Sequence, residues 1–206
     1  RSEVDRLIDS FIEREACDYQ SEFAVPLPCS VLLRVMGLPV EDLDLLLAIK
    51  DEIIHPPGGD NTADETRLRG VTRANAYFER AINERLVLPA DDLLTDLVQA
   101  TVQGHHRFTG LEVLRVCLNL VLGGLDTITA SLGCAMAYLA RHSDQRRRLI
   151  ESRSFVARAV RELMRTEAPV PVVPRVGGRD VTIAGADIRA GALVIVLLGS
   201  ASADET

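Results

Sequence analysis

An acid and an alcohol stand side by side in an apolar stretch of this chain, at Asp126 and Thr127. Two adjacent glycines, Gly123 and Gly124, come just before them. A glycine inside a helix costs about 1 kcal/mol relative to alanine, and a carboxylate in an apolar run has to be paired or functional. Glycines also allow the helical hydrogen-bond ladder to open, so that a ligand or water can enter. The pattern predicts that a ligand binds at this point of a buried helix and that the chemistry there requires proton transfer.

Two interpretations of this run are open. An acid beside a hydroxyl can relay protons into a dry pocket, which is a catalytic role. Alternatively, Gly123 and Gly124 allow close packing of two helices, and Asp126 is paired with an arginine elsewhere in the chain, because structural ion pairs are common.

Two further sets of charged residues follow. Glu162 and Arg165 are three residues apart, so they share one face of a helix. An exposed pair of this kind contributes only about 0.3–0.5 kcal/mol, which favours a structural role. Arg175 follows Pro174 at the start of strand-like sequence. Its guanidinium fork matches a carboxylate ligand, and the alternative is an ordinary surface arginine.

The elements that position these residues are mostly helical. Apolar spacing predicts helices over 2–15, 29–36, 40–54, 63–86, 91–102, 109–141, 143–151 and 154–165. Ser143 or Asp144, and Ser154, are the expected N-caps of the last two helices. Strands are predicted over 170–173, 181–183 and 194–198, a loop over 55–61 and a turn over 103–106. We expect a single domain that is mainly α with a small β part (α+β), helical over 1–168 and β-rich over 169–206.

Composition excludes several classes of function. The chain has 206 residues and a net charge of -7, which argues against nucleic acid and anionic membrane surfaces as partners. No signal peptide or membrane span is visible. Cys17, Cys29, Cys117 and Cys134 lack the short spacing of a metal site, so we expect no metal site within this chain. We expect no disulfides and a reducing, cytoplasmic location.

The order of these patterns resembles the cytochrome P450 family of haem-thiolate monooxygenases in its soluble bacterial form. The run from Gly123 to Thr127 resembles the family's Ala/Gly-Gly-x-Asp/Glu-Thr motif on the oxygen-activating helix. Glu162 and Arg165 resemble its Glu-x-x-Arg helix, and Arg175 resembles the arginine that meets a haem propionate. Segments 17–39, 89–95 and 139–146 also resemble family sequence, so the resemblance covers nearly the whole chain.

The resemblance implies an oxidoreductase with b-type haem that inserts one oxygen atom of O2 into a small apolar organic substrate. A ferredoxin-type protein would be its redox partner. The implied roles are proton relay for Asp126 and Thr127, room for oxygen over the haem at Gly123 and Gly124, a propionate contact for Arg175, and structural support from Glu162 and Arg165. Substrate-lining positions are Leu120, Val170, Val172 and Val173, with parts of the helices at 43–54 and 63–86.

The chain departs from the family pattern near its end. The family's haem iron is held by a cysteine in a loop of the form Phe-x-x-Gly-x-x-x-Cys-x-Gly, and none of the four cysteines has this setting. Residues 201–204 read Ala-Ser-Ala-Asp where the family usually has Asn-Arg-Asp. We therefore expect a fragment that lacks an N-terminal part and the cysteine loop, and that is not competent alone.

Two other functions stay open at this point. Asp91, Asp92 and Asp96 form an Asp-Asp-x-x-x-Asp string, which in isoprenoid synthases binds Mg²⁺ bridged to diphosphate. An acidic helix start explains the same string equally well. The third possibility is a non-catalytic helical remnant or binding piece.

Overall fold

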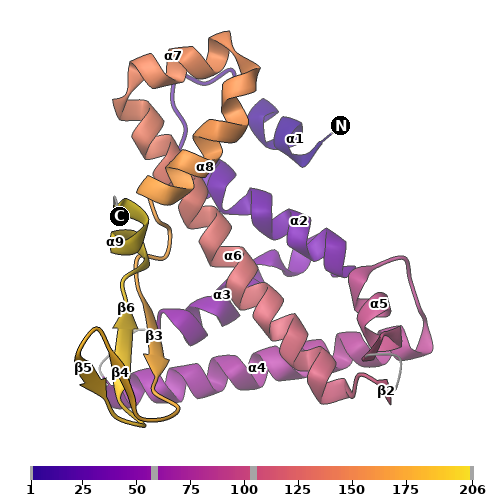
Figure 1. The fold of residues 1–206 in the computed structure, drawn as a ribbon. Helices are drawn as coiled ribbons and strands as arrows, with labels where there is room; N and C mark the ends of the chain where they lie inside the picture. The colour runs from indigo at the N-terminus through magenta and orange to yellow at the C-terminus, as the bar shows by residue number, and fades with distance from the viewer. Residues whose placement is uncertain (1, 57–59, 103–105, 205–206) are drawn as a thin grey trace. The chain divides into compact units, whose positions relative to one another are not determined.

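The structure is a computed structural model that describes residues 2–56, 60–102 and 106–204 (Figure 1). The chain forms two compact units, Arg1–Thr129 and Ala130–Thr206. The packing boundary falls inside one long helix, whereas the change from helices to strands falls after Thr166, close to the predicted position. The prediction of a mainly α fold with a small β part is confirmed.

The first unit is built from helices and one short hairpin. Its elements are α1 (Glu3–Asp9), the π-helical turn η1 (Gln20–Ala24), α2 (Pro26–Met36), the 3-10 turn η2 (Val40–Asp42), α3 (Leu43–Ile54), α4 (Asp60–Val87), α5 (Leu93–Gln99), β1 (Thr101–Val102), β2 (His106–Arg107) and the greater part of α6 (Gly110–Arg141). The predicted loop over 55–61 and turn over 103–106 lie partly outside the described residues.

One apolar core holds this unit together. Side chains from α2 to α6 meet there, and the largest fully buried ones are Phe78, Leu33, Met36, Leu46, Ile49, Leu94 and Val113. Fully burying an aliphatic or aromatic side chain of this size contributes about 1.5–3 kcal/mol. The core therefore fixes α6 against α2 and α3, the helices that surround its glycine–acid–alcohol run.

Helices α3 and α4 lie side by side, and a glycine allows the close approach (Figure 1). A Cβ at Gly70 would come within 2.9 Å of side-chain atoms of Glu52 and Ile53 on α3. Arg73 of α4 also donates to Glu52 across the same contact, at 2.6 Å. The position of α3, which carries Lys50 of the site described below, is therefore set by packing and by an ion pair.

Three predicted helix boundaries in this unit are wrong for local reasons. Helix α2 begins at Pro26 rather than at position 29, because proline is well tolerated in the first turn of a helix. Helix α5 ends at Gln99, and Thr101 pairs with Arg107 in an antiparallel hairpin. Helix α1 ends at Asp9 instead of continuing to position 15.

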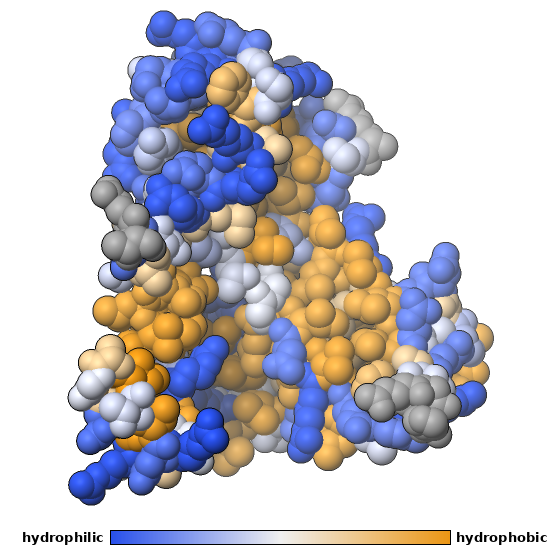
Figure 2. Space-filling model, in the orientation of Figure 1, coloured by the Kyte–Doolittle hydropathy of each residue, from blue (hydrophilic) through white to orange (hydrophobic). Residues whose placement is uncertain are grey.

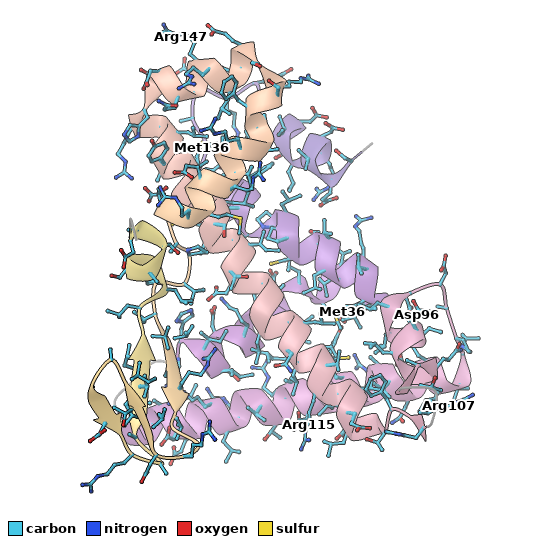
Figure 3. The ribbon with its side chains drawn as sticks, in the orientation of Figure 1. Met36, Asp96, Arg107, Arg115, Met136 and Arg147 are labelled. Atoms are coloured by element: carbon cyan, nitrogen blue, oxygen red, sulfur yellow. The ribbon has the colours of Figure 1, made fainter. Side chains whose placement is uncertain are left out.

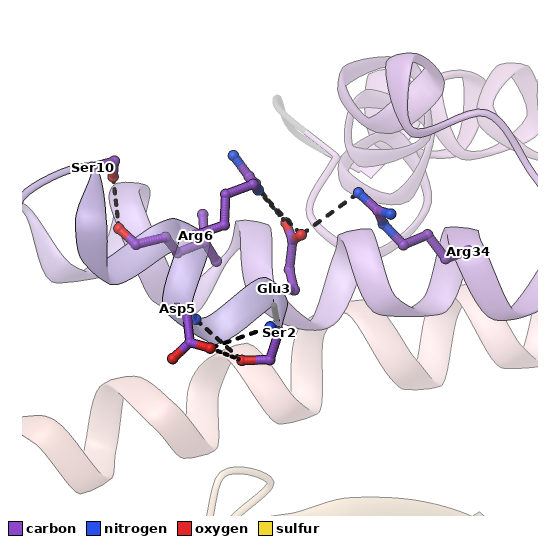
Figure 4. Close-up of polar contacts among 7 residues, drawn as sticks. Ser2, Glu3, Asp5, Arg6, Ser10 and Arg34 are labelled. Atoms are coloured by element: carbon purple, nitrogen blue, oxygen red, sulfur yellow. Dashed lines mark hydrogen bonds and ion pairs between the residues drawn. The ribbon is translucent and has the colours of Figure 1, made fainter.

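The contacts that begin and end α1 are local, and Figure 4 also draws an ion pair from Glu3 of α1 to Arg34 of α2. Ser2 and Asp5 form a capping box, in which the Ser2 hydroxyl accepts from the Asp5 amide and the Asp5 carboxylate accepts from the Ser2 amide. At the other end, the Ser10 hydroxyl donates to the Leu7 carbonyl at 2.7 Å. Such side-chain bonds to the backbone compete with helix continuation, which explains the short helix.

The second unit combines the end of α6 with two helices and two small sheets. Its elements are α7 (Ser143–Glu151), the 3-10 turn η3 (Arg153–Phe155), α8 (Val156–Thr166), β3 (Val173–Val176), β4 (Val181–Ile183), β5 (Ala186–Ile188), β6 (Leu193–Val196) and α9 (Leu198–Ala203). Strands β3 and β6 pair antiparallel, with Arg175 opposite Val194, and β4 pairs antiparallel with β5.

Several predictions for the second unit need correction. The N-cap of α7 is His142 and that of α8 is Phe155, so Ser143, Asp144 and Ser154 do not cap these helices. The first predicted strand, 170–173, is displaced to β3, which begins at Val173. Strand β5 and helix α9 were not predicted, because each is short and carries no strong apolar pattern.

The two units differ in burial. None of the described residues from 130 to 204 is buried, whereas the first unit contains the whole core of the described chain. Figure 2 shows hydrophobic residues gathered over the strands of the second unit and hydrophilic residues over α7. Exposed apolar side chains of the second unit include Ile150, Val160, Met164, Val176, Ile183, Leu193 and Ile195. Arginines such as Arg147 occupy the outer side of α7 (Figure 3).

Candidate functional site

Helix α6 carries the glycine–acid–alcohol run without a break. It is α-helical from Gly110 to Arg141, so the expected opening of the hydrogen-bond ladder at the glycines is not found. Instead, the Thr127 hydroxyl donates to the Gly123 carbonyl at 2.6 Å, one turn earlier. A threonine that bonds back in this way slightly destabilises and often bends a helix.

The two glycines differ in their surroundings. A Cβ at Gly123 would meet no heavy atom of the described residues within 4 Å, so this side of α6 faces open space. A Cβ at Gly124 would lie 3.3 Å from the Leu32 side chain of α2. The open side at Gly123 leaves room for a ligand against the helix. At Gly124, α6 packs closely against α2, which is the helix–helix contact that the second interpretation of this run expects.

Asp126 is held by one residue of α3, Lys50, and by His55, which directly follows that helix. The Lys50 Nζ donates to Asp126 Oδ1 at 3.1 Å, and the His55 Nε2 lies 3.1 Å from Asp126 Oδ2. The same Lys50 ammonium lies 2.7 Å from Asp51 Oδ1. The structure therefore pairs the carboxylate, as the second interpretation expected, but with a lysine and a histidine rather than an arginine.

These contacts shift the titration of the groups involved. Partial burial acts to raise the pKa of Asp126, but the hydrogen bonds from His55 and Lys50 outweigh it, so this pKa lies below its ordinary value. Burial acts to lower the pKa of Lys50, but its bonds to Asp51 and Asp126 raise it overall. Burial also raises the pKa of the nearby Cys29 thiol to about 11. At neutral pH Asp126 and Lys50 are thus charged and Cys29 is not.

Sequence reasoning missed Lys50 and His55 as parts of the site. They lie 76 and 71 positions before Asp126, and no local pattern connects residues at such separations. One signal was present, because Lys50 is the only lysine in the chain and directly follows an apolar run at positions 45–49. A buried lysine requires a paired carboxylate, and Asp126 is the acid of the apolar helix.

Glu162 and Arg165 form the expected pair on α8. Their charged atoms are 2.6 Å apart, and Arg165 Nη1 also donates to the Ser202 carbonyl of α9 at 2.7 Å. The pair thereby connects α8 to α9, which is a structural contact. A cavity of about 380 Å³ in the second unit lies among α6, α7 and α8. Its lining includes Glu162, Tyr138, Leu149, Phe155, Arg158 and Leu163.

The remaining predicted site residues are placed individually. Arg175 is exposed on β3, and its Nη1 donates to the Pro174 carbonyl at 2.8 Å. Leu120 packs against the core of the first unit. In the second unit, Val170 and Val173 are half-buried and Val172 is exposed. The roles of these residues in binding stay predictions.

The aspartates of the alternative metal site are engaged otherwise. Asp92 caps α5, where its Oδ1 accepts from the Thr95 amide at 2.8 Å, and its Oδ2 accepts from Arg85 Nε at 2.6 Å. Asp91 and Asp96 are exposed, and Asp96 is labelled in Figure 3. Among the described residues, no three His, Cys, Asp or Glu side chains are grouped as a metal site requires. The capping interpretation of this string is the one that the geometry supports.

Helix α6 qualifies the expectation that the chain has no membrane span. It is 32 residues long with a mean hydropathy of 1.5 in its most apolar window, which is enough to cross a membrane by length and composition. This is weak support for a span, because the core helix of a soluble protein passes the same test. The buried residues of α6, among them Val113, Cys117 and Leu125, belong to the core of the first unit.

Known proteins of one kind are similar to this chain over most of its length. A family model described as Cytochrome P450 matches residues 67–206. Cytochrome P450 130 of Mycobacterium tuberculosis is 37% identical over 189 residues, which are 91% of this chain and 46% of that protein. The chain spans about half the length of the curated relatives it matches.

Solved structures show the same likeness. Bacillaene polyketide synthase cytochrome P450 PksS of Bacillus subtilis 168 matches with a TM-score of 0.89 and 27% identity, over 98% of this chain and 51% of that chain. P450BioI, solved in complex with an acyl carrier protein ligated to hexadec-9Z-enoic acid, matches with a TM-score of 0.88 and 28% identity, over 98% of this chain and 52% of that chain.

Proposed function

Because the chain belongs to the cytochrome P450 family, we propose that it is the oxygen-side part of a haem-dependent monooxygenase. This oxidoreductase inserts one oxygen atom of O2 into a small apolar organic substrate. The observation that carries the proposal is the run on α6, where open space beside Gly123 lies one turn from an acid and an alcohol. A glycine with free space, next to groups that exchange protons, suits a helix that faces a reacting small molecule.

The residues of this chain fit b-type haem in two separate places. Gly123 leaves space for a flat ligand to approach α6, because no side chain projects there, and Gly124 adds no side chain of its own. In the second unit, the exposed guanidinium of Arg175 suits a carboxylate such as a haem propionate. When bound, haem supplies the activation of dioxygen, and the protein supplies position, protons and a dry pocket.

Asp126 and Thr127 are the proposed proton relay. The Asp126 side chain is 36% exposed, so it can exchange protons with water. The Thr127 hydroxyl donates to the Gly123 carbonyl, and a hydroxyl is a group that can both donate and accept a hydrogen bond. A proton taken up at the Asp126 carboxylate passes by way of the Thr127 hydroxyl toward the space beside Gly123. Glu162 and Arg165 act structurally by holding α8 to α9.

The test is Thr127→Ala in a full-length, haem-loaded protein that contains this chain. Without the hydroxyl, reducing equivalents should be lost as hydrogen peroxide, and we expect the ratio of product to peroxide to fall about tenfold or more, since a positioned proton donor contributes 10²–10⁴-fold. Thr129→Ala is the matched control, because Thr129 makes the same backbone bond one turn on, to Leu125 at 2.7 Å. Unchanged coupling in Thr127→Ala would refute the relay.

The remaining parts of the proposal concern partners. Leu120, Val170, Val172 and Val173 contact the apolar substrate, and a ferredoxin-type protein supplies electrons. The free cysteines Cys29 and Cys117, both buried, support a cytoplasmic location, since disulfides are rare there.

A further inference from the structure

The cavity in the second unit is walled by apolar side chains and by two arginines. Its volume of about 380 Å³ lies in the range of pockets that hold small organic molecules. The apolar part of the lining comes from the end of α6, from α7, from η3 and from α8, and consists of Tyr138, Leu139, Leu149, Phe155, Ala159 and Leu163. We propose that this cavity binds a small organic carboxylate with an apolar body, through Arg148 and Arg158. This inference does not rest on the proposed function, because the cavity uses no residue of the run at positions 123–127.

The charges around the cavity favour an anion. Among the described residues that line it, Glu162 is the only acid, and its carboxylate is paired with Arg165 at 2.6 Å. The bond from Arg165 and, to a smaller extent, the charge of Arg158 lower the pKa of Glu162, so this acid is ionised at neutral pH. Neither Arg148 nor Arg158 forms an ion pair with a carboxylate of the described chain. Two positive charges of the lining are therefore uncompensated, and the guanidinium fork matches a carboxylate.

Arg148 is positioned in a way that leaves its donors available. Its guanidinium carbon lies 5.0 Å from the centroid of the Phe155 ring, and its Nη1 is 3.5 Å from Gln145 Oε1. A cation–π contact engages the charge rather than a particular N–H group, and a hydrogen bond of 3.5 Å is weak. The ring thus holds Arg148 at the cavity while most of its five N–H donors stay free for a ligand.

The sequence around the cavity is basic, although the chain as a whole is acidic. Residues 141–165 contain eight arginines and three acidic residues, whereas the whole chain has a net charge of -7. A local field of this sign raises the concentration of anions near the cavity. The charge distribution therefore supports the same class of ligand as the two unpaired arginines.

An apolar ligand body would supply contacts that the second unit lacks. None of its described residues is buried, and Leu149, Ala159 and Leu163 of the lining are half-buried. Covering apolar walls with hydrocarbon removes them from water, which is favourable in proportion to the area covered. A ligand that binds only the folded state also stabilises it, so α7 and α8 should become more stable when the cavity is filled.

Octanoate is the probe for the first test, because it joins a carboxylate to an apolar chain. In the 206-residue chain, the Nε–H signals of the arginine side chains are followed by NMR during a titration with octanoate. The signals of Arg148 and Arg158 should shift and saturate. Octanol lacks the charge and acetate lacks the apolar body, so each should bind at least about tenfold more weakly than octanoate. No saturable shift, or octanol binding as tightly as octanoate, would overturn the proposal.

Two variants and one matched control locate the site. Arg158→Gln should raise the dissociation constant for octanoate at least about tenfold, since it removes a charged hydrogen-bond donor. Ala159→Leu should do the same by filling the cavity without changing its charge, and it decides if Arg158→Gln does not fold. Arg161→Gln is the control, because Arg161 is an exposed residue of α8 outside the lining, and its loss should change the constant less than about threefold. Equal effects of Arg158→Gln and Arg161→Gln would mean diffuse attraction and would overturn the site.

The second test uses the full-length, haem-loaded protein that contains this chain. The part of octanoate binding that depends on Arg158 should persist there, with at least about tenfold weaker binding in Arg158→Gln. If no such binding remains, another segment fills the cavity and the proposal is wrong. Coupling in Thr127→Ala is measured separately, so failure of the proton relay and failure of this site give different results.

Discussion

The carboxylate of Asp92 lies where α2, α4 and α5 meet, and its contacts connect these three helices. It caps α5 through the Thr95 amide, and it pairs with Arg85, which in turn donates to the Gly37 carbonyl at 2.6 Å. The Asp92 side chain is only 4% exposed. An ion pair of this burial is costly to break, because the remaining charge loses its partner.

We predict that Asp92→Ala lowers the free energy of unfolding by about 3 kcal/mol, from the lost cap and the broken buried pair. Urea unfolding followed by circular dichroism measures the difference. Asp91→Ala is the control, because Asp91 is the exposed neighbour and its replacement should change stability by less than about 0.5 kcal/mol. Equal effects of the two substitutions would contradict this account of Asp92.

The same comparison has a defined pH dependence. Burial acts to raise the pKa of Asp92, but the bonds from Thr95 and Arg85 outweigh it, so its folded pKa lies below its ordinary value. Its stabilising contribution is therefore complete above the unfolded pKa of about 3.9 and is lost as pH falls through the folded pKa. The stability difference between wild type and Asp92→Ala should be constant down to about pH 5 and shrink below about pH 4.

At the residue scale, the sequence predicts which groups matter but not what they contact. The types and spacing of Asp126 and Thr127 were enough to single out the helix. The partners of Asp126 were not predictable, because a contact between positions 50 and 126 depends on how α3 and α6 pack. The contact between Glu162 and Arg165 was predicted correctly, because the two residues are three positions apart on one helix and their contact does not depend on how helices pack.

At the scale of elements, the end of α2 depends on one glycine. Gly37 has a φ of 75°, in the left-handed region, and it forms the C-cap of α2. A Cβ at this position would overlap the carboxylate of Asp92, which cannot move away without losing its cap and its ion pair. The junction of α2, α4 and α5 is therefore closed around a position that only glycine fits.

We predict that Gly37→Ala destabilises the chain by at least about 2 kcal/mol, from the left-handed backbone and the displaced Asp92. Gly110→Ala is the matched control, since a Cβ there meets no described atom within 4 Å at the start of α6. That substitution should leave the thermal unfolding temperature unchanged or raise it slightly. A Gly37→Ala variant as stable as wild type would show that Asp92 can rearrange freely.

Long elements were predictable and short ones were not. The helix from about 109 to 141 was placed within one residue, because its apolar periodicity extends over many turns. The caps at Ser143 and Ser154 were wrong, since the Ser154 hydroxyl bonds the Ser152 hydroxyl at 2.8 Å instead of a helix amide. Strand β5, only three residues long, has too little pattern to detect.

At the scale of the whole molecule, stability is distributed unevenly. The first unit has a continuous core that includes Phe78 and Leu94, whereas no described residue of the second unit is buried. Apolar burial is the dominant favourable contribution to folding. The strands and helices after position 130 therefore depend on local hydrogen bonds to a greater degree than α2 to α6 do.

We predict that hydrogen exchange distinguishes the two units. Amides in α2, in α4 and in α6 before position 130 should be protected at least about tenfold more than amides in α7, α8 and β3 to β6. Mass spectrometry of deuterated peptides measures this, and residues of α6 on either side of position 130 give an internal comparison within one helix. Equal protection throughout would mean that the second unit has a core of its own.

The single lysine has one more consequence, which concerns proteolysis. A lysine-specific endoprotease has only one internal target in this chain, the bond between Lys50 and Asp51. That bond lies inside α3, and the Lys50 side chain is paired with the carboxylates of Asp51 and Asp126. Cleavage therefore requires α3 to unwind. The rate of cleavage after Lys50 therefore reports how often α3 separates from α6. Gel electrophoresis measures this rate without any label or mutation.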